Sequence, residues 1–131
     1  MTSEKLSGLA RLTDAAFLSE QGKLAKLSRK EAELRAQLAH LLEDRAMTAH
    51  ADRPLGDAAL AAGADIRWHQ WIAVRQTRLN AELLQIMELK RLQLRNVRKA
   101  HGRAQALEQL TLRAQADARR KKAARQDRDI G

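Results

Sequence analysis

Apolar side chains recur along the first part of the chain at alternating steps of four and three residues. This 3.5-residue spacing is typical of a coiled-coil seam, in which one stripe of a helix packs against a second helix. The pattern predicts a helix over about residues 3–50, with Thr2 or Ser3 as its N-cap. Its seam positions, which include three polar residues, are Leu6, Ala10, Thr13, Phe17, Glu20, Leu24, Leu27, Glu31, Leu34, Leu38 and Leu41.

A break follows, over about residues 51–64. It contains Pro54, the only proline of the chain, and two of the six glycines, Gly56 and Gly63. Proline and glycine disfavour a continuous helix, so we predict a loop here, with at most a short turn of helix over residues 57–62. Asp65 then reads as the N-cap of a second helix.

The second helix is predicted over about residues 65–124, where no proline occurs and apolar residues keep helical spacing. Gly102 interrupts it at a cost of about 1 kcal/mol relative to alanine, which a long packed helix tolerates. The register of its seam is ambiguous, because at some turns two neighbouring positions fit the spacing equally well. Its candidates are Trp68, Ile72, Leu79, Leu83, Ile86, Leu89 or Lys90, Leu94, Val97, His101, Ala104 and Leu107 or Glu108.

A short loop between two long helices returns the chain beside itself. We therefore predict an all-α fold, a long antiparallel two-helix coiled-coil hairpin that spans residues 1–131 as a single unit. With the turn near residue 58, residue 1 faces roughly residue 115. Residues from about 115 to 131 then form an overhang without an intramolecular partner helix.

Composition agrees with long helices and bounds the function. The chain has 31% charged and 44% hydrophobic residues, but only 2% aromatic residues and no cysteine. The missing cysteines exclude disulfides, thiolate zinc sites and a cysteine nucleophile. No run of 18 apolar residues and no signal-peptide pattern occurs, so we expect a cytoplasmic protein.

The net charge of +9 is unevenly distributed. Residues 1–90 carry 13 Lys/Arg and 12 Asp/Glu, whereas residues 91–131 carry 12 Lys/Arg and four acids. Such a basic segment attracts anionic partners, although cations are also favoured at any helix C-terminus by the macrodipole. The candidate partner-binding cations are Arg113, Arg119, Arg120, Lys121, Lys122 and Arg125.

Trp68 and Trp71 follow the predicted loop and are the second candidate partner site. Large rings are enriched among interface hot spots. The alternative is that they close the end of the hairpin by packing on four leucines: Leu41, Leu42, Leu55 and Leu60.

Motifs for catalysis are missing from the sequence. His40 has carboxylates at helical spacing, Glu43 and Asp44, but no second histidine shares that face, so we expect no metal site. There is no nucleophile elbow and no Gly-rich phosphate loop. We therefore expect no catalytic residues, no cofactor, no small-molecule substrate and no enzymatic activity.

In length, layout and charge the chain resembles the stalk proteins of flagellar and type III secretion export, the FliJ/YscO-like family. The most suggestive stretches are residues 23–34, KLAKLSRKEAEL, and residues 97–103, VRKAHGR. The resemblance implies a cytoplasmic two-helix stalk that fits the pore of a hexameric export ATPase. It also implies contact with the export gate and with export chaperones, and membrane association only through these partners.

Two other classes stay open at this point. A basic helical protein can bind nucleic acid or another anionic surface through charge alone, although no stacking aromatics lie among these cations. A two-helix hairpin also leaves one stripe uncovered, so two hairpins could pair into a four-helix bundle as a self-assembling structural protein.

Overall fold

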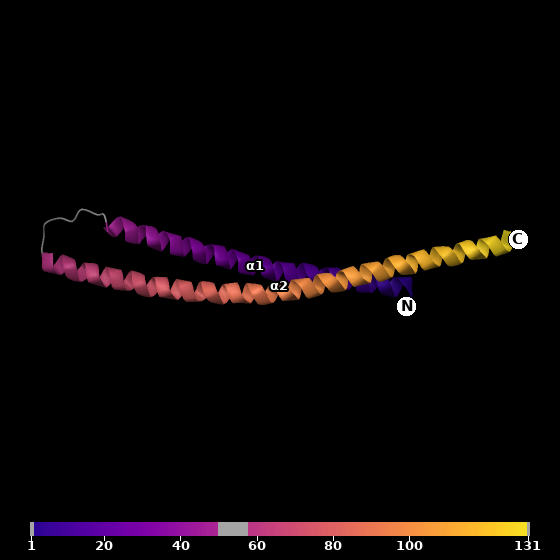
Figure 1. The fold of residues 1–131 in the computed structure, drawn as a ribbon, viewed down its shortest axis with the longest axis horizontal. Helices are drawn as coiled ribbons and strands as arrows, with labels where there is room; N and C mark the ends of the chain where they lie inside the picture. Colours follow the sequence, from indigo (N-terminus) through magenta and orange to yellow (C-terminus); the bar gives the residue numbers. More distant parts are fainter. Residues whose placement is uncertain (1, 50–57, 131) are drawn as a thin grey trace. The chain divides into compact units, whose positions relative to one another are not determined.

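The computed structural model describes residues 2–49 and 58–130, which form two α-helices, α1 (Ser3–Ala49) and α2 (Ala58–Ile130) (Figure 1). The described residues contain no strand. The two helices pack against each other, so the predicted all-α helical hairpin is confirmed. Neither helix contains, in the described part, a stretch long and apolar enough to cross a membrane.

Contacts between the helices divide the chain into two compact units. The first unit joins Met1–Ala25 to Leu92–Gly131. Within it the side chain of Gln93 donates a hydrogen bond to Glu20, and the Phe17 ring lies 5.0 Å from that of His101. Phe17 precedes Glu20 in α1, whereas its partner His101 follows Gln93 in α2. The two segments are therefore antiparallel.

The second unit is Lys26–Arg91. Its core is a cluster of four buried side chains, Leu34, Leu41, Ile72 and Leu79. Burying a side chain of this size contributes about 1.5–3 kcal/mol. Four partly buried residues pack against the cluster and extend it along both helices: Leu38, Trp68, Leu83 and Ile86.

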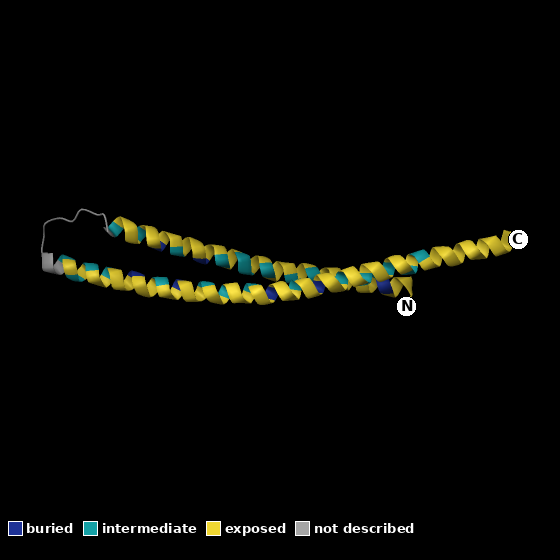
Figure 2. Ribbon diagram, viewed as in Figure 1, coloured by how far each residue is buried: buried dark blue, intermediate teal, exposed yellow. Residues whose placement is uncertain are grey.

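The buried stripe of α1 coincides with the predicted seam. All eleven seam positions from Leu6 to Leu41 are buried or half-buried (Figure 2). The N-terminus of α1 is capped by Thr2, whose Oγ1 accepts a hydrogen bond from the Lys5 amide at 3.4 Å. The Leu6 amide donates to the Thr2 carbonyl oxygen at 3.1 Å, so two of the first amide groups find acceptors.

In α2 the register departs from the prediction at two positions. Leu94 is 38% exposed and His101 is also exposed, whereas their neighbours Gln93 and Ala100 are buried at 8% and 7% exposure. The buried positions keep strict steps of four and three, so a residue's place in this register decides its burial more than its hydrophobicity does. Beyond Ile72, the buried and half-buried positions at these steps are Gln76, Leu79, Leu83, Ile86, Lys90, Gln93, Val97, Ala100, Ala104, Leu107, Thr111 and Ala114, and Ala116 is half-buried outside them.

The start of α2 also differs from the prediction. The helix begins at Ala58, so residues 58–64 are helical instead of part of the loop, and Asp65 lies inside the helix instead of at its N-cap. Alanine has the highest helix propensity, and the alanines around Gly63 offset the cost of about 1 kcal/mol for that glycine. At the other end α2 continues to Ile130, six residues beyond the predicted end.

Candidate functional site

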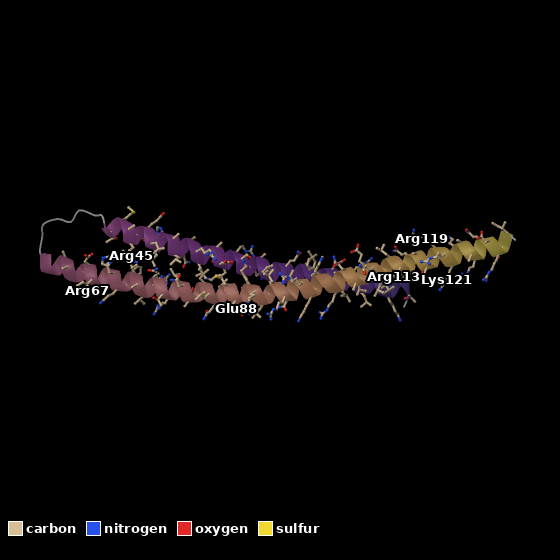
Figure 3. The ribbon with its side chains drawn as sticks, viewed as in Figure 1. Arg45, Arg67, Glu88, Arg113, Arg119 and Lys121 are labelled. Carbon is tan, nitrogen blue, oxygen red and sulfur yellow. The ribbon has the colours of Figure 1, made fainter. Side chains whose placement is uncertain are left out.

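The candidate basic residues lie on the last turns of α2, in the first unit. Arg113 is exposed, and every residue from Asp117 to Ile130 is exposed as well (Figure 2). Figure 3 labels Arg113, Arg119 and Lys121 on these turns. We call residues 117–130 the basic tip. The preceding turns differ from the tip, because Thr111, Ala114 and Ala116 are half-buried there.

The basic tip holds six Lys/Arg and three Asp. One of the aspartates pairs with a cation of the tip, since Arg120 Nη2 lies 3.2 Å from Asp117 Oδ1. Both side chains of this pair are more than 60% exposed, so solvent screens it and it contributes at most about 1 kcal/mol. The tip is therefore a solvated helix of excess positive charge that a partner can approach from any side.

The two tryptophans lie near the start of α2, in the second unit. Their rings stack with centroids 5.4 Å apart and an interplanar angle of 16°. Trp68 is half-buried against the apolar core cluster, whereas Trp71 is 53% exposed. One ring thus packs inside the hairpin while the other offers its surface to solvent.

The predicted packing partners of the tryptophans are only partly described. Leu41 belongs to the cluster on which Trp68 packs, and Leu42 is 41% exposed. Leu55 and the side chain of Leu60 lie outside the described residues. Beside Trp71 a hollow of 190 Å³ opens between the helices, lined by Gln37, His40, Leu41, Asp44, Trp71, Arg75 and Leu79.

A feature that sequence reasoning missed is a set of polar contacts within the seam. In the second unit Lys90 Nζ lies 2.6 Å from Glu31 Oε2, and Arg35 Nη2 lies 2.9 Å from Glu31 Oε1. The Glu31 side chain is only 16% exposed. Hydrogen bonds from Lys90 and, less strongly, from Arg35 stabilise the carboxylate and hold the pKa of Glu31 below its ordinary value.

The first unit contains a similar contact. Gln93 Nε2 donates to the Glu20 backbone oxygen at 2.9 Å and to Glu20 Oε2 at 2.5 Å. Gln93 in turn accepts a hydrogen bond from Asn96 at 3.2 Å. The bond from Gln93, followed by that from Lys23, holds the pKa of Glu20 below its ordinary value. Part of the signal was present in the sequence, because Glu20 and Glu31 occupy seam positions, but their partners on α2 depend on the register between the helices.

The histidines do not gather into a site. His40 Nε2 lies 3.8 Å from Asp44 Oδ2, and His69 Nε2 lies 3.8 Å from Asp65 Oδ1, each within one turn of its own helix. Among residues 2–49 and 58–130, no group of three His, Cys, Asp or Glu side chains could hold a metal ion.

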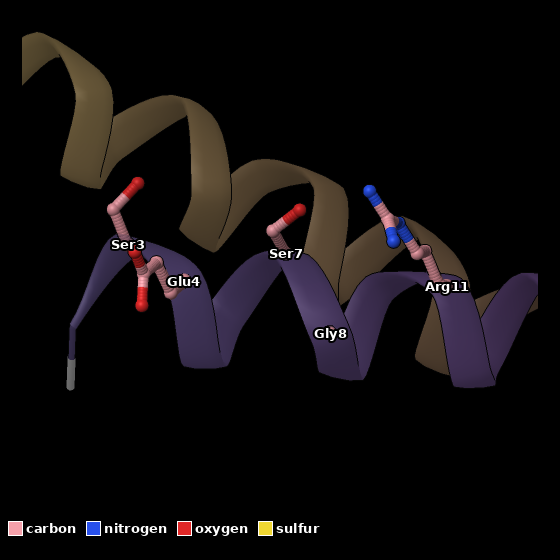
Figure 4. A pocket seen from close by; sticks show the side chains of 5 residues that line it. All are labelled: Ser3, Glu4, Ser7, Gly8 and Arg11. Carbon is pink, nitrogen blue, oxygen red and sulfur yellow. The ribbon is translucent and has the colours of Figure 1, made fainter.

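A surface hollow of 410 Å³ lies along the N-terminal turns of α1 (Figure 4). Its lining residues, Ser3, Glu4, Ser7, Gly8 and Arg11, all come from one helix. In Figure 4 the side chains of Ser3, Ser7 and Arg11 rise from the same side of α1. A hollow on a single helix lacks the facing walls that enclose a small molecule.

No family model, curated protein or solved structure matches this chain.

Proposed function

We propose that this chain is a non-enzymatic coiled-coil stalk or adaptor of a flagellar or type III protein export apparatus. It works in the cytoplasm, docks in the export ATPase hexamer and contacts the export gate and export chaperones. It needs no cofactor for this role, because it acts through shape and charge. The proposal rests on the family resemblance, and the observation that carries it is the exposed basic tip of α2.

The seam and the tip support this role in different ways. The heptad seam gives two long helices a common packing face, which stiffens each of them against bending. The tip continues α2 as an exposed helix rich in cations. A partner cavity lined by acidic or polar groups would attract such a tip and guide it into place.

The proposal predicts that charge reversal at the tip abolishes stimulation of the export ATPase. The variant changes Arg119, Arg120, Lys121 and Lys122 together to Glu. The expected result is ATPase turnover no higher than that of the ATPase alone, because the tip then repels the groups that it should approach. Steady-state phosphate release, measured with increasing amounts of the chain, tests this.

A control variant carries the same change in net charge on the other helix. It reverses four exposed cations of α1: Arg11, Lys26, Arg29 and Lys30. We expect this control to retain most of the stimulation, and circular dichroism should show equal helicity for both variants. Full stimulation by the tip variant would remove the basic tip from the mechanism.

A further inference from the structure

The seam face of α2 continues beyond the region that α1 covers. In the first unit the buried or half-buried positions of α2 include Ala100, Ala104, Leu107, Thr111 and Ala114, at steps of four and three. Because α2 is one helix to Ile130, the same steps lead onward to a further set of positions on the same face. These positions are Ala118, Lys121, Arg125 and Arg128.

The chemistry of this face changes where the cover of α1 ends. Beneath α1 it is mostly alanine and leucine, whereas three of the four positions beyond Ala114 are cationic and exposed. We call Lys121, Arg125 and Arg128 the seam-face triad. An apolar helix in the place of α1 would leave these charges desolvated and unpaired, so the triad selects a partner with negative charge.

The hairpin itself shows how a cation at this kind of position is satisfied. Lys90 occupies the seam of α2 in the second unit and pairs at 2.6 Å with Glu31, a seam residue of the opposing helix. A helix with carboxylates at heptad spacing would offer the triad the same kind of pairing, with one carboxylate for each cation.

We propose that the seam-face triad binds an acidic α-helix of a partner protein, which lies along the face of α2 that α1 occupies in the preceding turns. The inference rests on the proposed function for the assignment of the basic tip as a docking site, and it adds the face and the chemistry of the partner. Continuity with the α1–α2 interface favours a helix as the occupant. The triad's charge favours Glu and Asp at the positions of that helix that face α2.

The residues beside the triad argue against the other occupants. Asp117 and Asp129 flank the triad at the positions that border a coiled-coil seam. The phosphates of a nucleic acid form a broad anionic surface that would also meet these aspartates. A second copy of this chain is a poor match as well, because the seam of α1 is mainly apolar and the net charge is +9.

Two triple variants with the same change in charge isolate the face. The test variant is Lys121→Gln, Arg125→Gln and Arg128→Gln. The control is Arg113→Gln, Arg119→Gln and Arg120→Gln, whose residues are exposed and, at about 100° per residue, lie roughly 85° to 155° around the helix from the centre of the triad. Glutamine keeps the helix propensity of the cations that it replaces, so circular dichroism should give equal helicity for both.

The probe is a stapled acidic helical peptide of about 20 residues with Glu at heptad a and d positions. A second peptide has the same composition, but its Glu residues are spread around the helix. Binding to the chain of residues 1–131 is measured by fluorescence anisotropy. A salt concentration of about 150 mM limits the long-range attraction between charges to about 8 Å. Differences between faces of one helix then remain measurable.

We expect the test variant to bind the heptad peptide at least about tenfold more weakly than the unchanged chain, and the control to stay within about threefold. The spread peptide should bind the unchanged chain more weakly than the heptad peptide. Equal losses in both variants, no loss in either, or no preference between the peptides would overturn the inference. So would a short DNA duplex that binds more tightly than the heptad peptide at the same salt.

The outcome is separable from that of the proposed function, because the peptide assay contains no ATPase. Face-dependent peptide binding with unchanged ATPase stimulation by the tip variant would keep the triad as a helix-binding site and remove the export stalk. ATPase stimulation that depends on the tip, together with peptide binding that does not depend on the face of α2, would keep the export-stalk proposal and remove the helix-binding site.

Discussion

Leu34 of α1 and Ile72 of α2 are each 1% exposed, the lowest values among the described side chains. A hairpin of two helices buries only one stripe on each, so a few such residues carry much of the apolar contribution to stability. Other leucines of the same unit, such as Leu84 at 66% exposed, contribute little because they remain in water. At the scale of single residues, position in the seam therefore matters more than residue type.

We predict that Leu34→Ala lowers the free energy of unfolding by about 3 kcal/mol, through lost burial and the cavity that remains. Chemical denaturation followed by circular dichroism measures this change. Leu84→Ala is the matched control in the same unit and should stay within about 0.5 kcal/mol of the unchanged chain. Similar losses in the two variants would show that Leu34 is not a core residue.

At the scale of elements, α2 continues through Gly102, and it contains no proline that would kink it. The structure shows no reason for glycine at this position. An added Cβ would meet nothing within 4 Å, and no glycine of the described residues has a positive φ angle. The glycine therefore costs backbone entropy with no gain in packing.

We predict that Gly102→Ala raises the free energy of unfolding by about 0.5–1 kcal/mol. The matched reverse change, Ala106→Gly, is at an exposed position of the same helix and should lower it by a similar amount. Thermal and urea unfolding of both variants measure the two shifts. A loss of stability in Gly102→Ala would mean that this site contacts something other than solvent.

The sequence predicted the two helices and the seam of α1, because the apolar residues of α1 that lie off the seam, such as Leu9 and Leu18, do not recur at steps of four and three. In α2 the exposed Leu89, Leu92 and Leu94 border the seam, so spacing did not decide among neighbouring positions. The choice of Gln93 over Leu94 depends on a hydrogen bond to Glu20, a residue distant in sequence. Pairing across helices requires the register between them, which a single sequence does not contain.

The candidate site, like the fold, was predictable only in part. The basic cluster is visible in the sequence as a run of cations, and its exposure follows from the different lengths of the two helices. The division of that cluster into faces depends on the register of α2. Arg128 was not among the candidate residues, although the register places it on the same face as Lys121 and Arg125.

At the scale of the whole molecule, 25 Lys/Arg outnumber 16 Asp/Glu, and the excess lies mainly after residue 90. Acid therefore affects the protein in two ways. Protonation of carboxylates raises an already positive net charge, and the resulting repulsion acts on the entire chain. It also removes the negative charge of Glu20 and Glu31, whose side chains hold the two helices together within their respective units.

The pKa values of Glu20 and Glu31 lie below the ordinary value of 4.5 in the folded chain, so each ionised carboxylate favours folding. Their contribution is fully present above about pH 4.5 and is lost as the pH falls through the lower pKa of the folded state. We predict that the melting temperature falls as the pH decreases from 5 to about 3, and that Glu20→Gln with Glu31→Gln reduces this dependence. The double variant Glu33→Gln with Glu43→Gln changes the net charge equally at exposed positions, so it separates general repulsion from the two seam contacts. If both double variants show the same acid dependence, repulsion across the chain explains the loss, and the two seam carboxylates contribute no specific stability.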